Sequence, residues 1–99
     1  FISGQIPFNQ ATETLVTTGI QDETKQVMQN LAYIIEEAGL TFENVVKATI
    51  FITDMDNFSL INEVYATYFT TETAPARECV QVAKLPRNVN IEISMILHK

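Results

Sequence analysis

The run VVKATIFIT at positions 45–53 constrains the fold of this 99-residue chain more than any other segment. It is rich in β-branched residues and short for a helix, so it predicts a strand. Because side chains alternate across a strand, the run divides into Val46, Ala48, Ile50 and Ile52 on one side and Val45, Lys47, Thr49, Phe51 and Thr53 on the other. Both sets contain apolar side chains that need cover.

Two segments with helical periodicity lie on either side of this run. The first helix is predicted over residues 22–38, where Asp22 and Glu23 suit the positive end of the helix dipole and Gly39 follows as a C-terminal cap. A second helix is predicted over residues 58–69. The other expected elements are strands at 1–4, 15–16, 77–84 and 91–97, loops at 5–12 and 70–76, and turns at 54–57 and 85–88.

This order of elements predicts an α+β domain in which two helices pack on one face of a mixed sheet. Two helices cover only one face, and the other face would carry Val45 and Phe51. That face is either half-solvated or packed against other subunits. The strand pattern favours neither alternative.

Composition narrows the class of protein. The 99 residues suit one domain, and 46% apolar with 18% charged residues is typical of a globular protein. The formal net charge of −6 argues against nucleic-acid and anionic-membrane partners. No apolar run is long enough to cross a bilayer and no signal peptide is evident, so cytoplasm, or an organelle matrix, is the expected location.

Arg77 and Glu92 are the first candidates for chemistry. Arg77 follows Pro75 at the start of a predicted strand, where its planar fork of donors would suit a carboxylate ligand. The alternative is an ordinary surface arginine. Glu92 lies within an apolar strand, where a buried carboxyl group could serve as general acid or base. The alternative is a solvent-facing position, because Ser94 shares its side of the strand.

The remaining candidates carry weaker signals. Cys79 is the single cysteine and His98 the single histidine, which excludes an internal disulfide and disfavours both a Cys–His catalytic pair and a metal site. Cys79 is therefore expected in the core. Ser3 and Gly4 could offer a hydroxyl and a backbone N–H to a ligand, or simply form a turn. Asn62 is expected to be solvated or capping.

Five strings taken in order resemble one family. They are FISGQIP at 1–7, QVMQNL at 26–31, NVVKATIFITDM at 44–55, INEVY at 61–65 and PARECVQVAKLP at 75–86. Together they cover nearly the whole chain and are similar to the RidA, or YjgF-like, family of reactive-intermediate deaminases. The last string is the most diagnostic.

The resemblance implies a chorismate-mutase-like α+β fold and a homotrimer with a central sheet-lined core and pockets between subunits. It implies cofactor-free hydrolysis of 2-aminoacrylate, 2-iminobutanoate and 2-iminopropanoate to 2-keto acids and ammonia. An alternative is a non-catalytic or regulatory module that binds small carboxylates on the same scaffold.

The resemblance also assigns roles to individual residues. Arg77 corresponds to the carboxylate-binding arginine and Glu92 to the acid that positions or activates water. The backbone of Cys79 corresponds to a ligand contact, and Ser3, Gly4 and Asn62 to positions that line the pocket.

The chain also departs from the family pattern. The resemblance implies a single RidA-like domain over residues 1–99 that lacks the family's N-terminal segment with its pocket tyrosine. Ser94 replaces an acid found in many relatives, and Glu78 stands where a small residue is common.

Overall fold

The computed structural model describes residues 1–72 and 74–99. Its elements are β1 (Ile2–Gln5), β2 (Phe8–Asn9), β3 (Thr14–Leu15), α1 (Ile20–Glu37), η1 (Phe42–Asn44), β4 (Val45–Ile52), η2 (Met55–Asn57), α2 (Phe58–Ala66), β5 (Ala76–Gln81), η3 (Pro86–Asn88) and β6 (Ile91–Leu97). Of the predicted loop 70–76, residue 73 lies outside the described residues.

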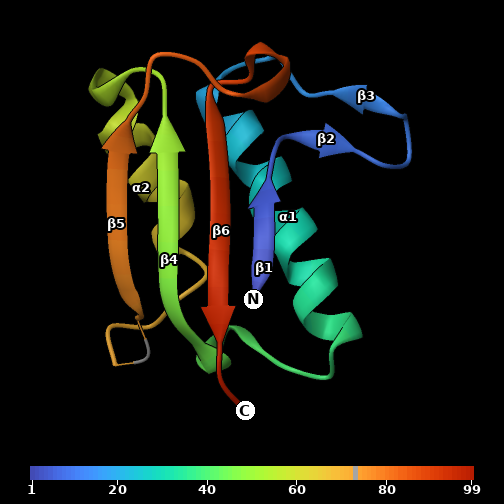
Figure 1. Cartoon of the computed structure of the whole chain (residues 1–99), viewed down its shortest axis with the longest axis vertical. Helices are drawn as coiled ribbons and strands as arrows, with labels where there is room; N and C mark the ends of the chain where they lie inside the picture. The colour runs from blue at the N-terminus through green and yellow to red at the C-terminus, as the bar shows by residue number, and fades with distance from the viewer. Residues whose placement is uncertain (73) are drawn as a thin grey trace.

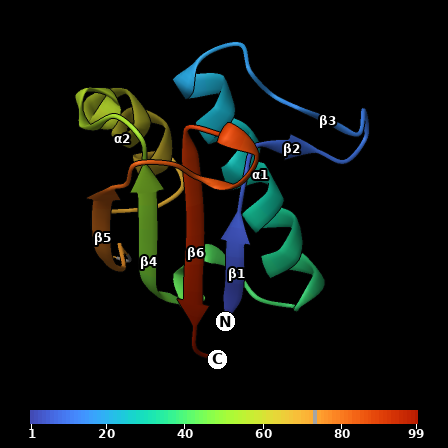
Figure 2. The same cartoon turned by 45° about the horizontal axis from the view of Figure 1, so that its top comes forward.

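Four strands form one mixed sheet in the order β1-β6-β4-β5. Strand β4 pairs with β5 in parallel and with β6 in antiparallel orientation, and β1 pairs with β6 in antiparallel orientation. Both helices lie behind the sheet in Figure 1, and the tilted view of Figure 2 keeps them on that same side. The predicted α+β class, with two helices on one face of a mixed sheet, is confirmed.

Helix α1 begins two residues before the predicted start and ends one residue before the predicted end. Asp22 and Glu23 lie in its first turn, as expected. Gly39 follows with φ 74°, and the Leu40 N–H donates to the carbonyl of Ile35 at 3.0 Å. Glycine adopts this left-handed conformation without steric cost, so it ends the helix where predicted.

The predicted sides of Val45 and Val46 are wrong. The register with β6 shifts between Val45 and Lys47, which are paired with the adjacent residues Leu97 and Ile96. This β-bulge inserts Val46 as an extra residue and turns Val45 inward. Val45 is 4% exposed and Val46 is 49% exposed.

Two other elements are shorter than predicted. Helix α2 ends at Ala66 and is followed by a turn, whereas the apolar pattern continues to Phe69. Strand β5 ends at Gln81, although the predicted strand extended to Lys84. The N–H of Val82 still donates to the carbonyl of Ile52 at 2.8 Å, so pairing with β4 stops just beyond β5.

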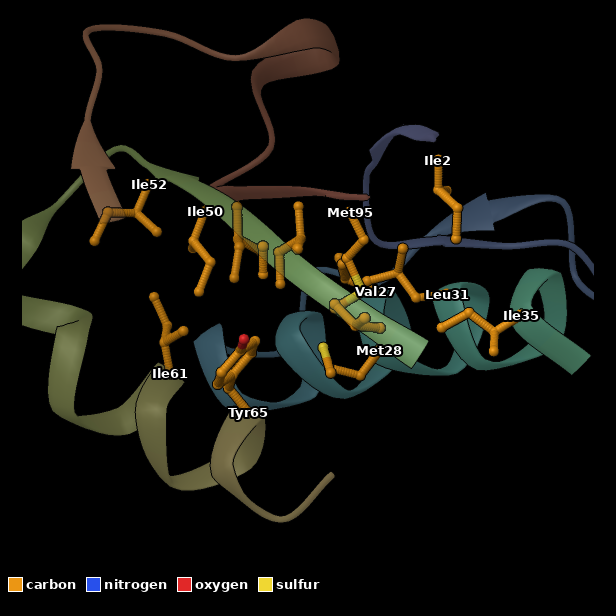
Figure 3. Packing of buried hydrophobic residues seen from close by; sticks show 14 residues of the cluster. Ile2, Val27, Met28, Leu31, Ile35, Ile50, Ile52, Ile61, Tyr65 and Met95 are labelled. Atoms are coloured by element: carbon orange, nitrogen blue, oxygen red, sulfur yellow. The ribbon is translucent and has the colours of Figure 1, made fainter. Parts of the chain in front are cut away.

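The core lies between the sheet and the two helices. Figure 3 shows Val27, Leu31 and Met95 converging from α1 and β6, with Ile61 and Tyr65 entering from α2. Every one of these side chains is at most 5% exposed. Burial of apolar area on this scale is the main stabilising term in a domain of this size.

The opposite face of the sheet has no covering layer among the described residues. Val80 is 41% and Ile96 is 43% exposed. Both share this face with Phe51, which pairs with Val80 on β5 and with Glu92 on β6. Ile96 lies four residues after Glu92 in β6, so its side chain points to the same face. A Lys47–Glu78 ion pair with an N–O distance of 2.6 Å crosses the same face. We call this surface the open face.

Candidate functional site

Arg77 is the second residue of the edge strand β5. It pairs with the buried Ala48, so its side chain leaves the sheet on the helix-covered side. There its Nη1 donates a hydrogen bond to Oδ1 of Asn62 in α2. Arg77 is exposed, and a polar partner on a helix fixes the direction of its side chain.

Two aromatic rings also contact the Arg77 guanidinium. Its Cζ lies 5.3 Å from the ring centroid of Phe58 and 5.2 Å from that of Tyr65. Both distances are within the range of cation–π attraction. These rings were not predicted as site residues, although the spacing 58, 62, 65 along a helix places all three side chains on one face.

A depression of about 560 Å³ opens beside this arginine. Its lining comes from the exposed end of α2, the following segment and the start of β5, namely Asn62, Tyr65, Ala66, Phe69, Thr70, Thr71, Ala74, Pro75 and Arg77. The volume is in the range of small-molecule sites, and the lining combines apolar groups with one fixed cation. This depression is the candidate functional site.

Asn62 and Cys79 lie on the same side of the sheet as Arg77. Asn62 is half-buried and accepts a hydrogen bond from Arg77 instead of capping α2, so the capping alternative is wrong. Cys79 is half-buried and packs against the core cluster, as expected of a core cysteine. Burial raises the pKa of its thiol, and Arg77 offsets only part of that rise. A raised pKa disfavours the reactive thiolate at neutral pH.

Glu92, Gly4 and Ser3 form a second group on β6 and β1. Glu92 pairs with Phe51, which places its side chain on the open face, where it is half-buried. A Cβ added to Gly4 would lie 2.6 Å from Cδ of Glu92, so a larger residue here would displace this carboxylate. Ser3 is exposed in the same strand. The sequence could not show this contact, because it depends on β1 pairing with β6.

The two groups are separated within one chain. Arg77 lies on β5 and Glu92 on β6, with β4 between these strands. Adjacent strands are about 4.8 Å apart, so the two residues lie at least about 10 Å apart across the sheet. They also leave it on opposite faces. A substrate of three or four carbons is too small to contact both residues of the same chain.

A second depression, of about 570 Å³, lies between α1 and the β2–β3 ribbon, and none of the six candidate residues lines it. Its amides hold the ribbon in place: Asn30 Nδ2 donates to the carbonyls of Ile6 and Phe8. Within residues 1–72 and 74–99, no cluster of three or more His, Cys, Asp or Glu side chains could hold a metal ion.

None of the helices in the described part of the chain is long and apolar enough to cross a membrane.

Comparisons with known proteins agree on one family. The Endoribonuclease L-PSP family matches residues 1–99. The mouse protein 2-iminobutanoate/2-iminopropanoate deaminase is 44% identical over 96 residues, covering 97% of this chain and 70% of its own length. Other matching relatives are named only as RutC family proteins.

Solved structures give the same result. A Thermotoga maritima protein, described as a candidate endoribonuclease, is 48% identical with a TM-score of 0.94, covering 98% of this chain and 76% of its own. The structure of E. coli TdcF with bound serine is 40% identical with a TM-score of 0.90, covering 98% of this chain and 77% of its own. The chain therefore belongs to the Endoribonuclease L-PSP family, to which the RutC and Rid proteins also belong.

Proposed function

We propose that this protein hydrolyses small enamine and imine acids, such as 2-aminoacrylate, 2-iminobutanoate and 2-iminopropanoate, to 2-keto acids and ammonia. The observation that carries the proposal is the guanidinium of Arg77, held by Asn62 beside a depression of about 560 Å³. A planar guanidinium suits a carboxylate, which accepts two parallel hydrogen bonds from it. The mouse deaminase, 44% identical, supports the same chemistry.

The proposed site is shared between copies of the chain. Arg77, Asn62 and the backbone of Cys79 would come from one copy, and Ser3, Gly4 and Glu92 from its neighbour. The separation of the two groups within one chain supports this arrangement. So does the open face, where partly exposed Val80 and Ile96 need a cover. The expected assembly is a homotrimer with its open faces turned inward.

The proposed reaction needs only water as co-reactant. Arg77 binds the carboxylate, and protonation of the imine nitrogen makes its carbon electrophilic. Glu92 orients a water molecule and takes one of its protons as the oxygen adds to that carbon. Glu92 then returns its proton to the amine nitrogen, the C–N bond breaks, and ammonia leaves with its electron pair. The hydroxyl group loses its proton as the keto group forms. No cofactor or metal is expected to take part.

The test is keto-acid release from freshly generated 2-aminoacrylate. The wild-type protein should accelerate release over buffer, and Arg77→Ala should lose most of that gain. Arg87→Ala is the matched control, because the Arg87 guanidinium carbon also lies near an aromatic ring, 5.5 Å from Phe8, but outside the depression. No gain by wild type, or equal loss in both variants, would reject the proposal.

A non-catalytic binding module is the second candidate. It is favoured by the serine bound in the structure of E. coli TdcF, which shows that a relative holds a small amino acid. Titration of 2-oxobutanoate separates the two. Saturable binding that depends on Arg77, together with no turnover of 2-aminoacrylate, would support the binding module and exclude the deaminase.

A further inference from the structure

One face of α2 surrounds the Arg77 guanidinium. Phe58, Asn62 and Tyr65 follow at the spacing i, i+4, i+7, which places them one above another along a helix. Positions seven residues apart are separated by about 10 Å along the helix axis. The guanidinium carbon nevertheless lies 5.3 Å from the Phe58 ring centroid and 5.2 Å from the Tyr65 ring centroid, so it contacts both rings.

A hydrogen bond to Asn62 further restricts the orientation of the Arg77 guanidinium. Its position between Phe58 and Tyr65 on the helix places its Oδ1 where it accepts from Nη1 of Arg77. The two rings restrict movement along the helix, and the hydrogen bond restricts rotation of the planar group. A guanidinium carries five N–H donors, so this bond leaves a pair for a carboxylate.

We propose that Phe58 and Tyr65 are positioning residues that clamp Arg77 in its substrate-binding orientation, an inference that rests on the proposed function of Arg77. A free arginine side chain has several rotatable bonds whose freedom is lost when it grips a ligand. The clamp removes that freedom before the ligand arrives, so the ligand binds more tightly.

The ring of Tyr65 and its hydroxyl group have different surroundings. The side chain is 5% exposed, and its hydroxyl oxygen has no hydrogen-bond partner among the described residues. Figure 3 shows that oxygen directed toward the sheet, away from α2. The hydroxyl thus contributes no contact to the clamp, and the aromatic face alone carries it. Phenylalanine should therefore replace Tyr65 without loss of binding.

The experiment compares four variants of the full chain in steady-state turnover of 2-aminoacrylate and in NMR titration with 2-oxobutanoate. Phe58→Leu and Tyr65→Leu keep an apolar side chain but remove the ring. Tyr65→Phe keeps the ring. Phe42→Leu is the matched control, because Phe42 packs on Tyr68 and Phe69 rather than on Arg77.

Loss of either ring should raise KM and the Kd of 2-oxobutanoate about 2- to 5-fold, the effect of one exposed cation–π contact. The value of kcat should stay unchanged, because the carboxylate is held equally in ground and transition states. Tyr65→Phe and Phe42→Leu should match wild type. Phe58 is only half-buried, so Phe58→Leu remains informative if Tyr65→Leu fails to fold.

Relaxation of the Arg77 Nε–H group, measured without ligand, tests the clamp independently of activity. Its order parameter should fall in Phe58→Leu and stay unchanged in Phe42→Leu. An unchanged order parameter and Kd in Phe58→Leu would overturn the clamp. A wild-type protein with an ordered Arg77 but neither binding nor turnover would instead contradict the proposed function.

Discussion

The two faces of the sheet use similar side chains but differ in how far one chain completes them. On the covered face, Ile50 is 1% and Ile93 is 0% exposed. On the open face, Val80 is 41% and Ile96 is 43% exposed. A single chain therefore completes its core on one face, whereas the face that carries Glu92 has no covering layer among the described residues. The two groups of candidate site residues are divided between these faces, with Arg77 on the covered side and Glu92 on the open face.

The largest effect is expected from a charge placed on the open face. If a second copy covers this face, Ile96→Asp would bury an unpaired carboxylate at a cost of about 3–5 kcal/mol per copy. Analytical ultracentrifugation should then show a trimer for wild type and a monomer for the variant. Leu60→Asp is the matched control, because Leu60 is also 43% exposed but lies on α2. Trimers that persist in Ile96→Asp would show that the face is solvated.

Truncation on the covered face should be the next largest effect. Ile93→Ala leaves a cavity in the core behind β6 and should lower the free energy of unfolding by about 2–5 kcal/mol. Urea denaturation followed by circular dichroism measures this loss. Because Ile93 is fully buried within one chain, the loss should not depend on protein concentration. A loss below 1 kcal/mol, or one that varies with dilution, would contradict a core completed by a single chain.

Tyr65 makes the covered face sensitive to alkaline pH. Burial raises the pKa of this phenol from 10.0 to about 12, with Arg77 opposing the rise. Between these values the unfolded chain loses the proton while the folded chain keeps it, so stability is full below pH 10 and falls as pH rises. The loss should reach about 2–3 kcal/mol at pH 12. Denaturation of wild type and Tyr65→Phe should diverge across this range, and parallel profiles would contradict the shift.

The same residue should give a smaller effect at neutral pH. The Tyr65 hydroxyl is buried without a partner among the described residues. Its removal in Tyr65→Phe should raise the free energy of unfolding by about 1 kcal/mol, because an unsatisfied polar group no longer has to be desolvated. A lower midpoint in thermal denaturation of Tyr65→Phe would show that the hydroxyl has a partner in solution.

Periodicity predicted both helices and the four strands of the main sheet, because each pattern depends on residues close in sequence. It missed β2, which lies within the predicted loop 5–12. It failed at Val46, where the bulge depends on the register with β6. Alternation of side chains predicts that the open face carries apolar residues. It does not distinguish a half-solvated face from one packed against other subunits, because it does not reveal what packs against a strand.

The candidate site was harder to predict than the fold. The spacing of Phe58, Asn62 and Tyr65 was present in the sequence, but nothing local shows that Arg77 lies against that face of α2. This contact exists because β5 takes the edge position beside β4. The contact of Gly4 with Glu92 likewise depends on β1 pairing with β6. The family resemblance identified the candidate site residues, whereas the pairing of strands distant in sequence determines which of them lie close together.

The central claim is that Arg77 of one copy and Glu92 of another act on the same substrate. Mixing Arg77→Ala and Glu92→Gln subunits tests it most directly. Each variant alone should be nearly inactive on 2-aminoacrylate. After unfolding and joint refolding at equal amounts, about a quarter of the shared sites should contain both native residues, and a matching fraction of wild-type activity should return. Mixed assemblies that stay as inactive as the separate variants would contradict a shared site.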